Sequence, residues 1–139
     1  MRRFIIDTNL YIDWLNAGKH ESIIFQPDAV KFMSTVVMME LLAGAYSVHE
    51  RTRLHDLFTT FTKLGRIVTP SSATYQEAGD VLRQLQTVHG YHIQKSRSLV
   101  NDVLIALSAR TVGGTVVTQN KQDFLAIQSI SAFKLSLVS

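Results

Sequence analysis

Four acidic residues are candidates for a catalytic or metal-binding site, provided that the fold brings their side chains together. Asp7 directly follows a short run of strand-forming residues, and Glu40 lies in a long stretch that is otherwise free of charge. Asp102 is followed by five aliphatic residues, and Asp123 lies in a polar turn after a valine-rich run. Taken singly, Asp7 and Asp102 are ordinary helix caps, Glu40 is an exposed helix position and Asp123 is a turn residue. Their function therefore depends on whether they meet.

A site shared by these carboxylates would suit a divalent cation. Carboxylates that lie close together repel one another, and a bound cation removes the repulsion. Oxygen ligands favour Mg²⁺ or Mn²⁺, and the absence of cysteine excludes a cysteine zinc site and a thiolate nucleophile. Such an ion lowers the pKa of a bound water and neutralises the charge that develops on a phosphodiester during hydrolysis. The acids therefore predict metal-dependent phosphodiester hydrolysis, with one or two ions.

The segments that would position these acids alternate in type along the chain. Apolar runs of strand length occupy residues 4–6, 31–37, 66–69, 115–118 and 133–138. Helical patterns lie between them, at residues 10–15, 38–46, 48–64, 73–88 and 103–112, and residues 89–97 have the composition of a loop. This alternation predicts a single α/β domain over residues 1–139, in which helices cover both faces of a mostly parallel sheet of about four to five strands.

The predicted sheet brings the acids to one edge. In parallel α/β sheets the ligand site lies beyond the carboxyl ends of the strands. Asp7, Glu40 and Asp123 each follow an expected strand, while Asp102 stands at the start of an expected helix. We therefore expect all four side chains to converge.

Composition sets the outer limits. The 139 residues are 46% hydrophobic and 18% charged, which is typical of a folded domain. The formal charge of +3 is compatible with a polyanionic partner such as RNA, although it does not require one. No apolar run has the length of a membrane helix, and the N-terminus reaches Asp7 before a signal-peptide core could form. The expectation is a cytoplasmic protein without a membrane partner.

Four segments of the chain resemble, in order and spacing, the motifs of PIN-domain nucleases, and especially of the VapC-like toxins of bacterial toxin–antitoxin pairs. They are Ile5–Asn9, Met39–Gly44, Asn101–Ala106 and Val117–Phe124. The resemblance implies a PIN-like three-layer α/β/α fold with a doubly wound sheet. It also implies Mg²⁺- or Mn²⁺-dependent endoribonuclease activity, a homodimer, and inhibition by a small cognate antitoxin protein.

The resemblance also implies roles for individual residues. Asp7, Glu40 and Asp102 correspond to three core metal ligands, and Thr8 and Thr118 to supporting hydroxyls that orient ligands or water. The family places its fourth acid or amide either early or late in the last motif. Here Asn120 takes the early place and Asp123 the late one, and we favour Asp123 because a carboxylate adds charge.

Two basic residues near the expected site, and two alternative functions, also follow from the sequence. Lys95 and Arg97 lead into the Asp102 helix, where they serve either as phosphate contacts or as part of a solvated loop. The main hypothesis is an RNA-cleaving toxin. One alternative is a non-catalytic PIN-like module that binds RNA or protein. A haloacid-dehalogenase-like phosphatase ranks lower, because that class usually has a second aspartate two residues after the first, where this chain has Asn9.

Overall fold

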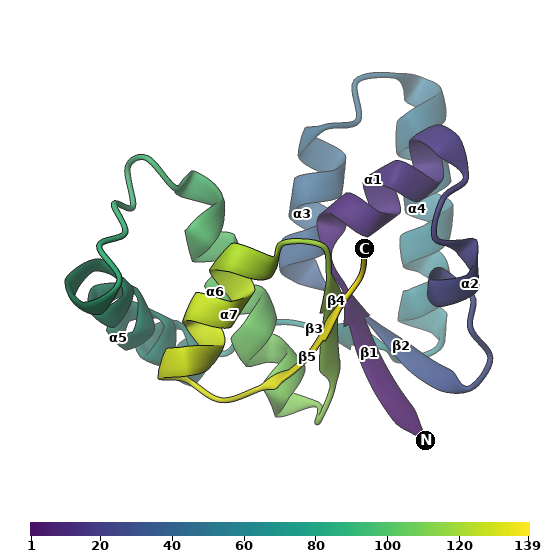
Figure 1. Ribbon diagram of the computed structural model, residues 1–139. Helices are drawn as coiled ribbons and strands as arrows, with labels where there is room; N and C mark the ends of the chain where they lie inside the picture. Colours follow the sequence, from purple (N-terminus) through teal and green to yellow (C-terminus); the bar gives the residue numbers. More distant parts are fainter.

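A five-stranded, all-parallel sheet runs through the computed structural model, which describes residues 1–139 (Figure 1). The strands are β1 (Arg2–Ile6), β2 (Ala29–Ser34), β3 (Ile67–Val68), β4 (Thr115–Thr118) and β5 (Lys134–Leu137). They lie in the order β3-β2-β1-β4-β5, and every neighbouring pair is parallel. The predicted α/β class and parallel sheet are confirmed, including the strand near the C-terminus.

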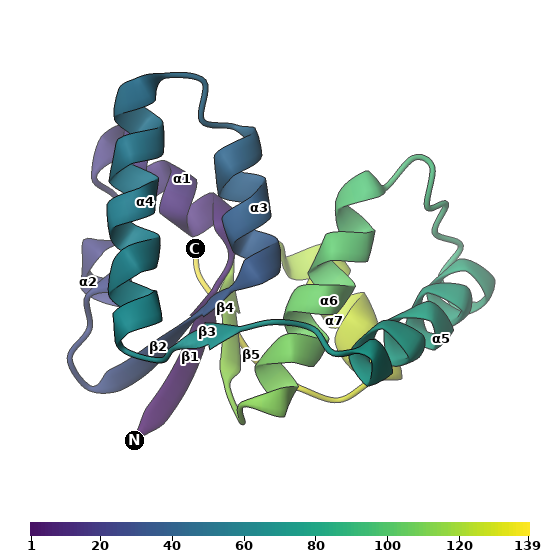
Figure 2. The ribbon, with the colours of Figure 1, turned by 180° about the vertical axis from the view of Figure 1, so that it is seen from behind.

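The helices fall into two groups. The first group connects β1 to β2 and β2 to β3: α1 (Thr8–Ala17), α2 (Glu21–Ile24), α3 (Thr35–Ala43) and α4 (Val48–Lys63). The second follows β3 and β4: α5 (Ser72–Val88), α6 (Arg97–Thr111) and α7 (Lys121–Ile130). Figures 1 and 2 show the two groups gathered on opposite sides of the sheet. None of these helices has the length and hydropathy needed to cross a membrane.

The winding of the chain reverses beside β1. The chain adds β2 and then β3 on one side of β1, and returns to place β4 and then β5 on the other side. The helices that leave the carboxyl ends of β1 and β4 therefore diverge to opposite faces. A crevice at such a reversal is the usual ligand site of an open parallel sheet.

Helix α6 is the most deeply buried helix. Residues Asp102 to Ala109 are all buried without interruption, so the helix is buried on every side where it passes between the sheet and α5. Asp102 is the only charged residue in that run. A carboxylate at this position lies in the interior of the protein.

The junction between β2 and α3 differs from the prediction. The apolar run 31–37 was expected to be one strand, but the strand ends at Ser34 and Val36 and Val37 belong to α3. The buried Ser34 hydroxyl accepts hydrogen bonds from the N–H groups of Val36 (3.1 Å) and Val37 (3.4 Å). The N-cap at Ser34 thus ends the strand and begins the helix inside one mainly apolar segment.

Three other helices depart from expectation. Helix α6 begins at Arg97 rather than 103, because the buried Leu99 extends its apolar face by one turn, and Asp102 is therefore not its cap. Helix α7 was expected only as a turn, but Asn120 caps it by accepting from the N–H of Asp123 at 3.4 Å. The short helix α2 was not predicted at all.

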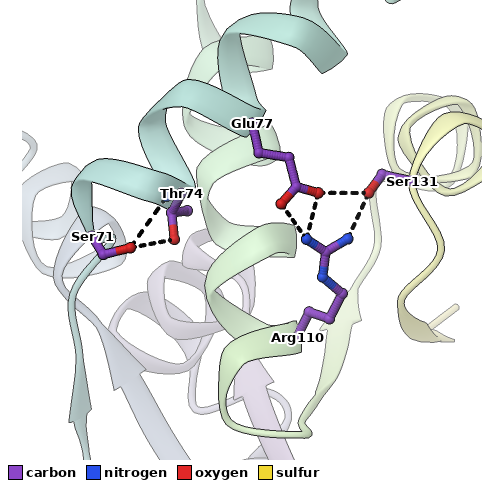
Figure 3. A network of polar contacts seen from close by, with 5 residues as sticks. All are labelled: Ser71, Thr74, Glu77, Arg110 and Ser131. Atoms are coloured by element: carbon purple, nitrogen blue, oxygen red, sulfur yellow. Dashed lines mark hydrogen bonds and ion pairs between the residues drawn. The ribbon is translucent and has the colours of Figure 1, made fainter.

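A polar network joins the three helices of the second group (Figure 3). Arg110, in the last turn of α6, forms an ion pair with Glu77 of α5. Its other guanidinium nitrogen donates to the Oγ of Ser131, which follows α7, at 2.7 Å. The Ser131 hydroxyl in turn donates to Glu77 at 3.2 Å. This network fixes α5, α6 and α7 to one another at the end of α6 that lies away from Asp102.

The Ser34 cap has a measurable consequence. Ser34→Ala removes the acceptor of two buried N–H groups, so we expect the free energy of unfolding to fall by about 1–2 kcal/mol in urea denaturation. Ser47→Ala is the matched control, because Ser47 caps α4 on the surface, where water replaces the lost acceptor. Equal losses in the two variants would contradict this account of the β2–α3 junction.

Candidate functional site

Asp7 and Thr118 join the two central strands at the point where the winding reverses. Asp7 follows β1 with an extended backbone (φ −66°, ψ 154°) and caps α1, where its Oδ1 accepts from the N–H of Thr8 at 2.8 Å. Its Oδ2 accepts from the hydroxyl of Thr118, the last residue of β4, at 2.7 Å. Only 4% of Asp7 and 0% of Thr118 is exposed. The cap role and the site role of Asp7 therefore coexist.

Glu40 connects three helices around this point. It lies on α3, and its Oε1 accepts from the Thr8 hydroxyl of α1 at 2.6 Å. Its Oε2 accepts from the side-chain amide of Asn101 on α6 at 3.3 Å. Glu40 is partly exposed, so the interpretation of this residue as a surface helix position is only half right. Its carboxylate is directed into the polar network.

Asp102 and Asp123 are linked through Asn120. The Asn120 side-chain amide donates to Asp102 Oδ2 and to Asp123 Oδ2, each at 3.1 Å. Asp123 lies in the first turn of α7, and its Oδ1 accepts from the phenol of Tyr91 at 2.7 Å. Both candidates for the fourth position therefore lie beside Asp102, with the amide placed between the two carboxylates.

Burial and mutual repulsion set the electrostatics of the site. Burial raises the pKa of Asp102 to about 8, and the negative charges of Asp7, Glu40 and Asp123 add to the effect, while the hydrogen bond from Asn120 opposes it. Burial also raises the pKa of Asp7, against the hydrogen bonds from Thr118 and Thr8. The pKa of Asp102 thus responds to the charges of the other three acids, as expected for groups that share one edge of the sheet.

No cation of the protein balances these charges. The three ion pairs of the structure join His20 to Asp13, Arg83 to Asp80 and Arg110 to Glu77, and none of them includes a site carboxylate. A buried carboxylate without a cationic partner either binds a proton or requires a cation from solution. An all-oxygen set of donors fits Mg²⁺ or Mn²⁺.

The carboxylates are linked by donors and do not already surround one point. No three acidic or histidine side chains are grouped closely enough to form a complete metal-ion site. Threonine hydroxyls and asparagine amides stand between them instead, and each carboxylate oxygen in the network keeps a lone pair for a further partner. The donor set fits a hard cation, while ligand geometry is not defined by these side-chain positions.

The structure brings together all four predicted acids and the three predicted supporting residues, Thr8, Thr118 and Asn120. It does not bring in Lys95 and Arg97, which are exposed and whose side chains form no hydrogen bond or ion pair. Two contributors were missed. Asn101, which the sequence analysis names only as the first residue of a motif, donates to Glu40, and Tyr91 lies in the segment expected to be a loop. The pair Asn101-Asp102 offered a signal, whereas nothing in the sequence pointed to Tyr91.

Comparison with known proteins agrees with this architecture. Among solved structures, VapBC2 from Rickettsia felis, bound to a DNA fragment from its promoter, contains a chain of TM-score 0.71 and 21% identity, with 99% of each chain covered. FitAcB from Neisseria gonorrhoeae gives a TM-score of 0.68 at 20% identity and 95% coverage of each chain. VapBC-5, from a toxin–antitoxin family of Mycobacterium tuberculosis, gives 0.63 at 20% identity, covering 99% of this chain and 100% of its own. These likenesses show a shared fold.

Sequence comparison identifies the family. A search of curated proteins finds no significant match. The sequence profile described as PIN domain matches residues 4–129, a span that contains all four acids, most of β1 and the whole of β2, β3 and β4. This match covers most of the chain and agrees with the parallel sheet and with the acids at its winding reversal, so the protein belongs to the PIN-domain family.

Proposed function

We propose that this PIN-domain protein is a divalent-metal-dependent endoribonuclease and acts as the toxin of a toxin–antitoxin pair. The observation that supports the activity most directly is the pair of buried carboxylates, Asp7 and Asp102, which repel one another and have no cation of the protein beside them. A protein gains no stability from such an arrangement. Buried carboxylates of this kind can bind a metal cation, and the bound cation can in turn bind a polyanionic substrate.

Each site residue has a distinct part in this proposal. Asp7, Glu40 and Asp102 would hold Mg²⁺ or Mn²⁺, and Asp123 would be the fourth ligand, with room for one or two ions. When bound, the cation supplies a water of lowered pKa and neutralises charge on the phosphodiester. Thr8 and Thr118 keep Glu40 and Asp7 in fixed orientations, because each donates its hydroxyl proton to a carboxylate oxygen.

The toxin assignment rests on the solved structures of similar fold. The Rickettsia, Neisseria and Mycobacterium structures are VapBC or FitAB-type complexes, and one of them is described as a toxin–antitoxin system. By analogy, we propose a small antitoxin as protein partner and a homodimer as the assembled form. A short reading frame beside the gene, whose product binds this chain on co-expression, would support the partner, and light scattering at micromolar concentration tests the dimer.

The buried carboxylates predict how metal and pH affect stability. The pKa of Asp102 is raised to about 8 in the folded protein and is about 4 in the unfolded chain. Between these values the folded state holds a proton that the unfolded state releases, so the metal-free protein loses stability as the pH rises from about 4 to about 8. Asp102→Asn removes this effect. In chelator, we expect the variant to gain about 4 °C or more in melting temperature over the parent at pH 8, and less at pH 5.5.

The same experiment tests the metal. Adding Mn²⁺ or Mg²⁺ at pH 8 should raise the melting temperature of the parent and leave that of Asp102→Asn nearly unchanged. Parallel pH curves for the two proteins in chelator would contradict the assignment of Asp102 as the buried charged group.

Catalysis provides the central test of the proposed function. Purified protein should cleave a mixed RNA pool with Mg²⁺ or Mn²⁺ and not with chelator. Asp7→Asn and Asp102→Asn should each lower the cleavage rate by 100-fold or more, on the order expected when charge stabilisation at a reacting centre is lost. Asp28→Asn is the matched control, because Asp28 is an exposed carboxylate without a hydrogen-bonded partner.

The outcomes of this assay separate the candidates. Cleavage that persists in chelator, or that both site variants retain, would rule out the proposed mechanism. RNA or protein binding by the folded protein, without cleavage in any condition, would instead support the non-catalytic module.

Lys95 and Arg97 give a separate prediction about substrate binding. We propose that these exposed cations contact RNA phosphates outside the site. The double variant Lys95→Ala/Arg97→Ala should raise KM for RNA and leave kcat within about twofold. The dependence of log Kd on log salt concentration should become shallower by roughly 0.7 for each lost phosphate contact on a single strand. An unchanged salt dependence would assign both residues to the solvated loop. Lys63→Ala is the control, because Lys63 is an exposed cation at the end of α4, which lies before β3 and away from the site.

A further inference from the structure

Asp123 is held from two sides by neutral donors. The phenol of Tyr91 donates to Oδ1 at 2.7 Å, and the side-chain amide of Asn120 donates to Oδ2 at 3.1 Å. The Asn120 amide is shared with Asp102, whereas Tyr91 makes no other side-chain hydrogen bond. Tyr91 is therefore the one donor that belongs to Asp123 alone.

The local backbone determines where Tyr91 lies. Gly90 adopts a left-handed conformation (φ 71°) just beyond α5, which returns the chain so that the Tyr91 N–H donates to the carbonyl of Leu85 at 3.2 Å. The Tyr91 ring packs against the hydrophobic core. One residue before Gly90, the His89 ring pairs with the Ser129 hydroxyl of α7 at 3.0 Å. The end of α5 is thus attached to α7 at two points, and Tyr91 is the one that reaches the site.

This attachment matters because, without Tyr91, Asn120 is the only side chain that holds the Asp123 carboxylate. The Asp123 side chain is only partly buried, and it lies in the first turn of α7, where a carboxylate is also stabilised by water and by the helix N-terminus. Asn120 donates to only one of the two carboxylate oxygens, Oδ2, and this single contact does not fix the position of Oδ1. A hydrogen bond from a phenol on a separate segment restricts the carboxylate to the site.

We propose that Tyr91 is a positioning residue for Asp123: its phenol holds the carboxylate in the orientation in which Asp123, with Asn120 beside it, contributes to divalent-metal binding. The proposal rests on the proposed function in treating Asp123 as a ligand. It assigns Asn120 the part of a bridge between two carboxylates. Partners that orient a ligand in this way typically change metal affinity or activity by about 10–100-fold when removed.

Mn²⁺ binding measured without RNA tests the proposal, by calorimetry and by electron paramagnetic resonance. We expect Tyr91→Phe, which removes one oxygen atom, to weaken Mn²⁺ binding about tenfold. Asp123→Asn should weaken it at least as much, and adding Tyr91→Phe to Asp123→Asn should have no further effect. Tyr75→Phe is the matched control, because Tyr75 is an exposed phenol on α5 without a hydrogen bond.

A second pair of variants moves the phenol without removing it. Gly90→Ala strains the left-handed turn that places Tyr91, and it should also weaken Mn²⁺ binding. Gly65→Ala introduces the same strain after α4, where φ is 67°, and should leave Mn²⁺ binding unchanged. In chelator, the melting temperature of Tyr91→Phe should stay within about 4 °C of the parent, which separates a loss of orientation from a loss of fold.

The results distinguish this proposal from the proposed function. Mn²⁺ affinity of Tyr91→Phe within twofold of the parent, or an equal further loss in the Asp123→Asn background, would overturn the role of Tyr91 and leave the nuclease proposal standing. Mn²⁺ binding that depends on Tyr91, in a protein that cleaves no RNA, would support this role and overturn the nuclease. A parent protein that binds no Mn²⁺ would overturn both.

Discussion

A single hydrogen bond, from the Thr118 hydroxyl to the Asp7 carboxylate, joins the ends of the two strands between which the sheet reverses its winding. Both side chains are almost fully buried, so this bond operates without competition from water. Asp7 also caps α1, and Thr118 accepts from the N–H of Asn120, which caps α7. The first helix of one face and the last helix of the other therefore begin from one pair of side chains, and the remaining site residues are placed relative to it.

The site is assembled from neutral donors around acidic acceptors. Threonine hydroxyls, asparagine amides and one phenol occupy the places in which a structural protein would have lysine or arginine. Cationic partners would neutralise the carboxylates permanently and would compete with a metal ion. Neutral donors orient the carboxylates and leave their charge available. Burying the Asp102 carboxylate costs free energy of folding. The buried apolar residues of α6 offset this cost through their packing.

The sequence predicted the structure best where a single local pattern, such as a strand-length apolar run followed by an acidic residue, defined an element. Strand-length runs followed by acids located the sheet edge, and Asp7, Glu40, Asp102 and Asp123 were all found from apolar neighbours and family motifs. This pattern failed where a helix follows a strand with no loop between them: the Ser34 cap divides residues 31–37, and the apolar residues on both sides of it were assigned to one strand. Tyr91 could not be found because its role depends on the contact of two segments 32 residues apart in the chain. Sequence periodicity indicates which face of a single helix or strand is buried, but it does not predict which side chains of distant segments contact each other.

The central position of β1 has a consequence for the stage of synthesis at which the site is completed. Asp7 emerges early in synthesis, but its partner Thr118 lies 111 residues later. At translation rates of roughly 5–20 residues per second, roughly 5–20 seconds pass before the second residue exists. A nascent chain therefore contains β1, β2 and their helices long before it contains the other half of the site. The carboxylate network is therefore completed only when the strand that carries Thr118 and the helix that carries Asp123 have been synthesised.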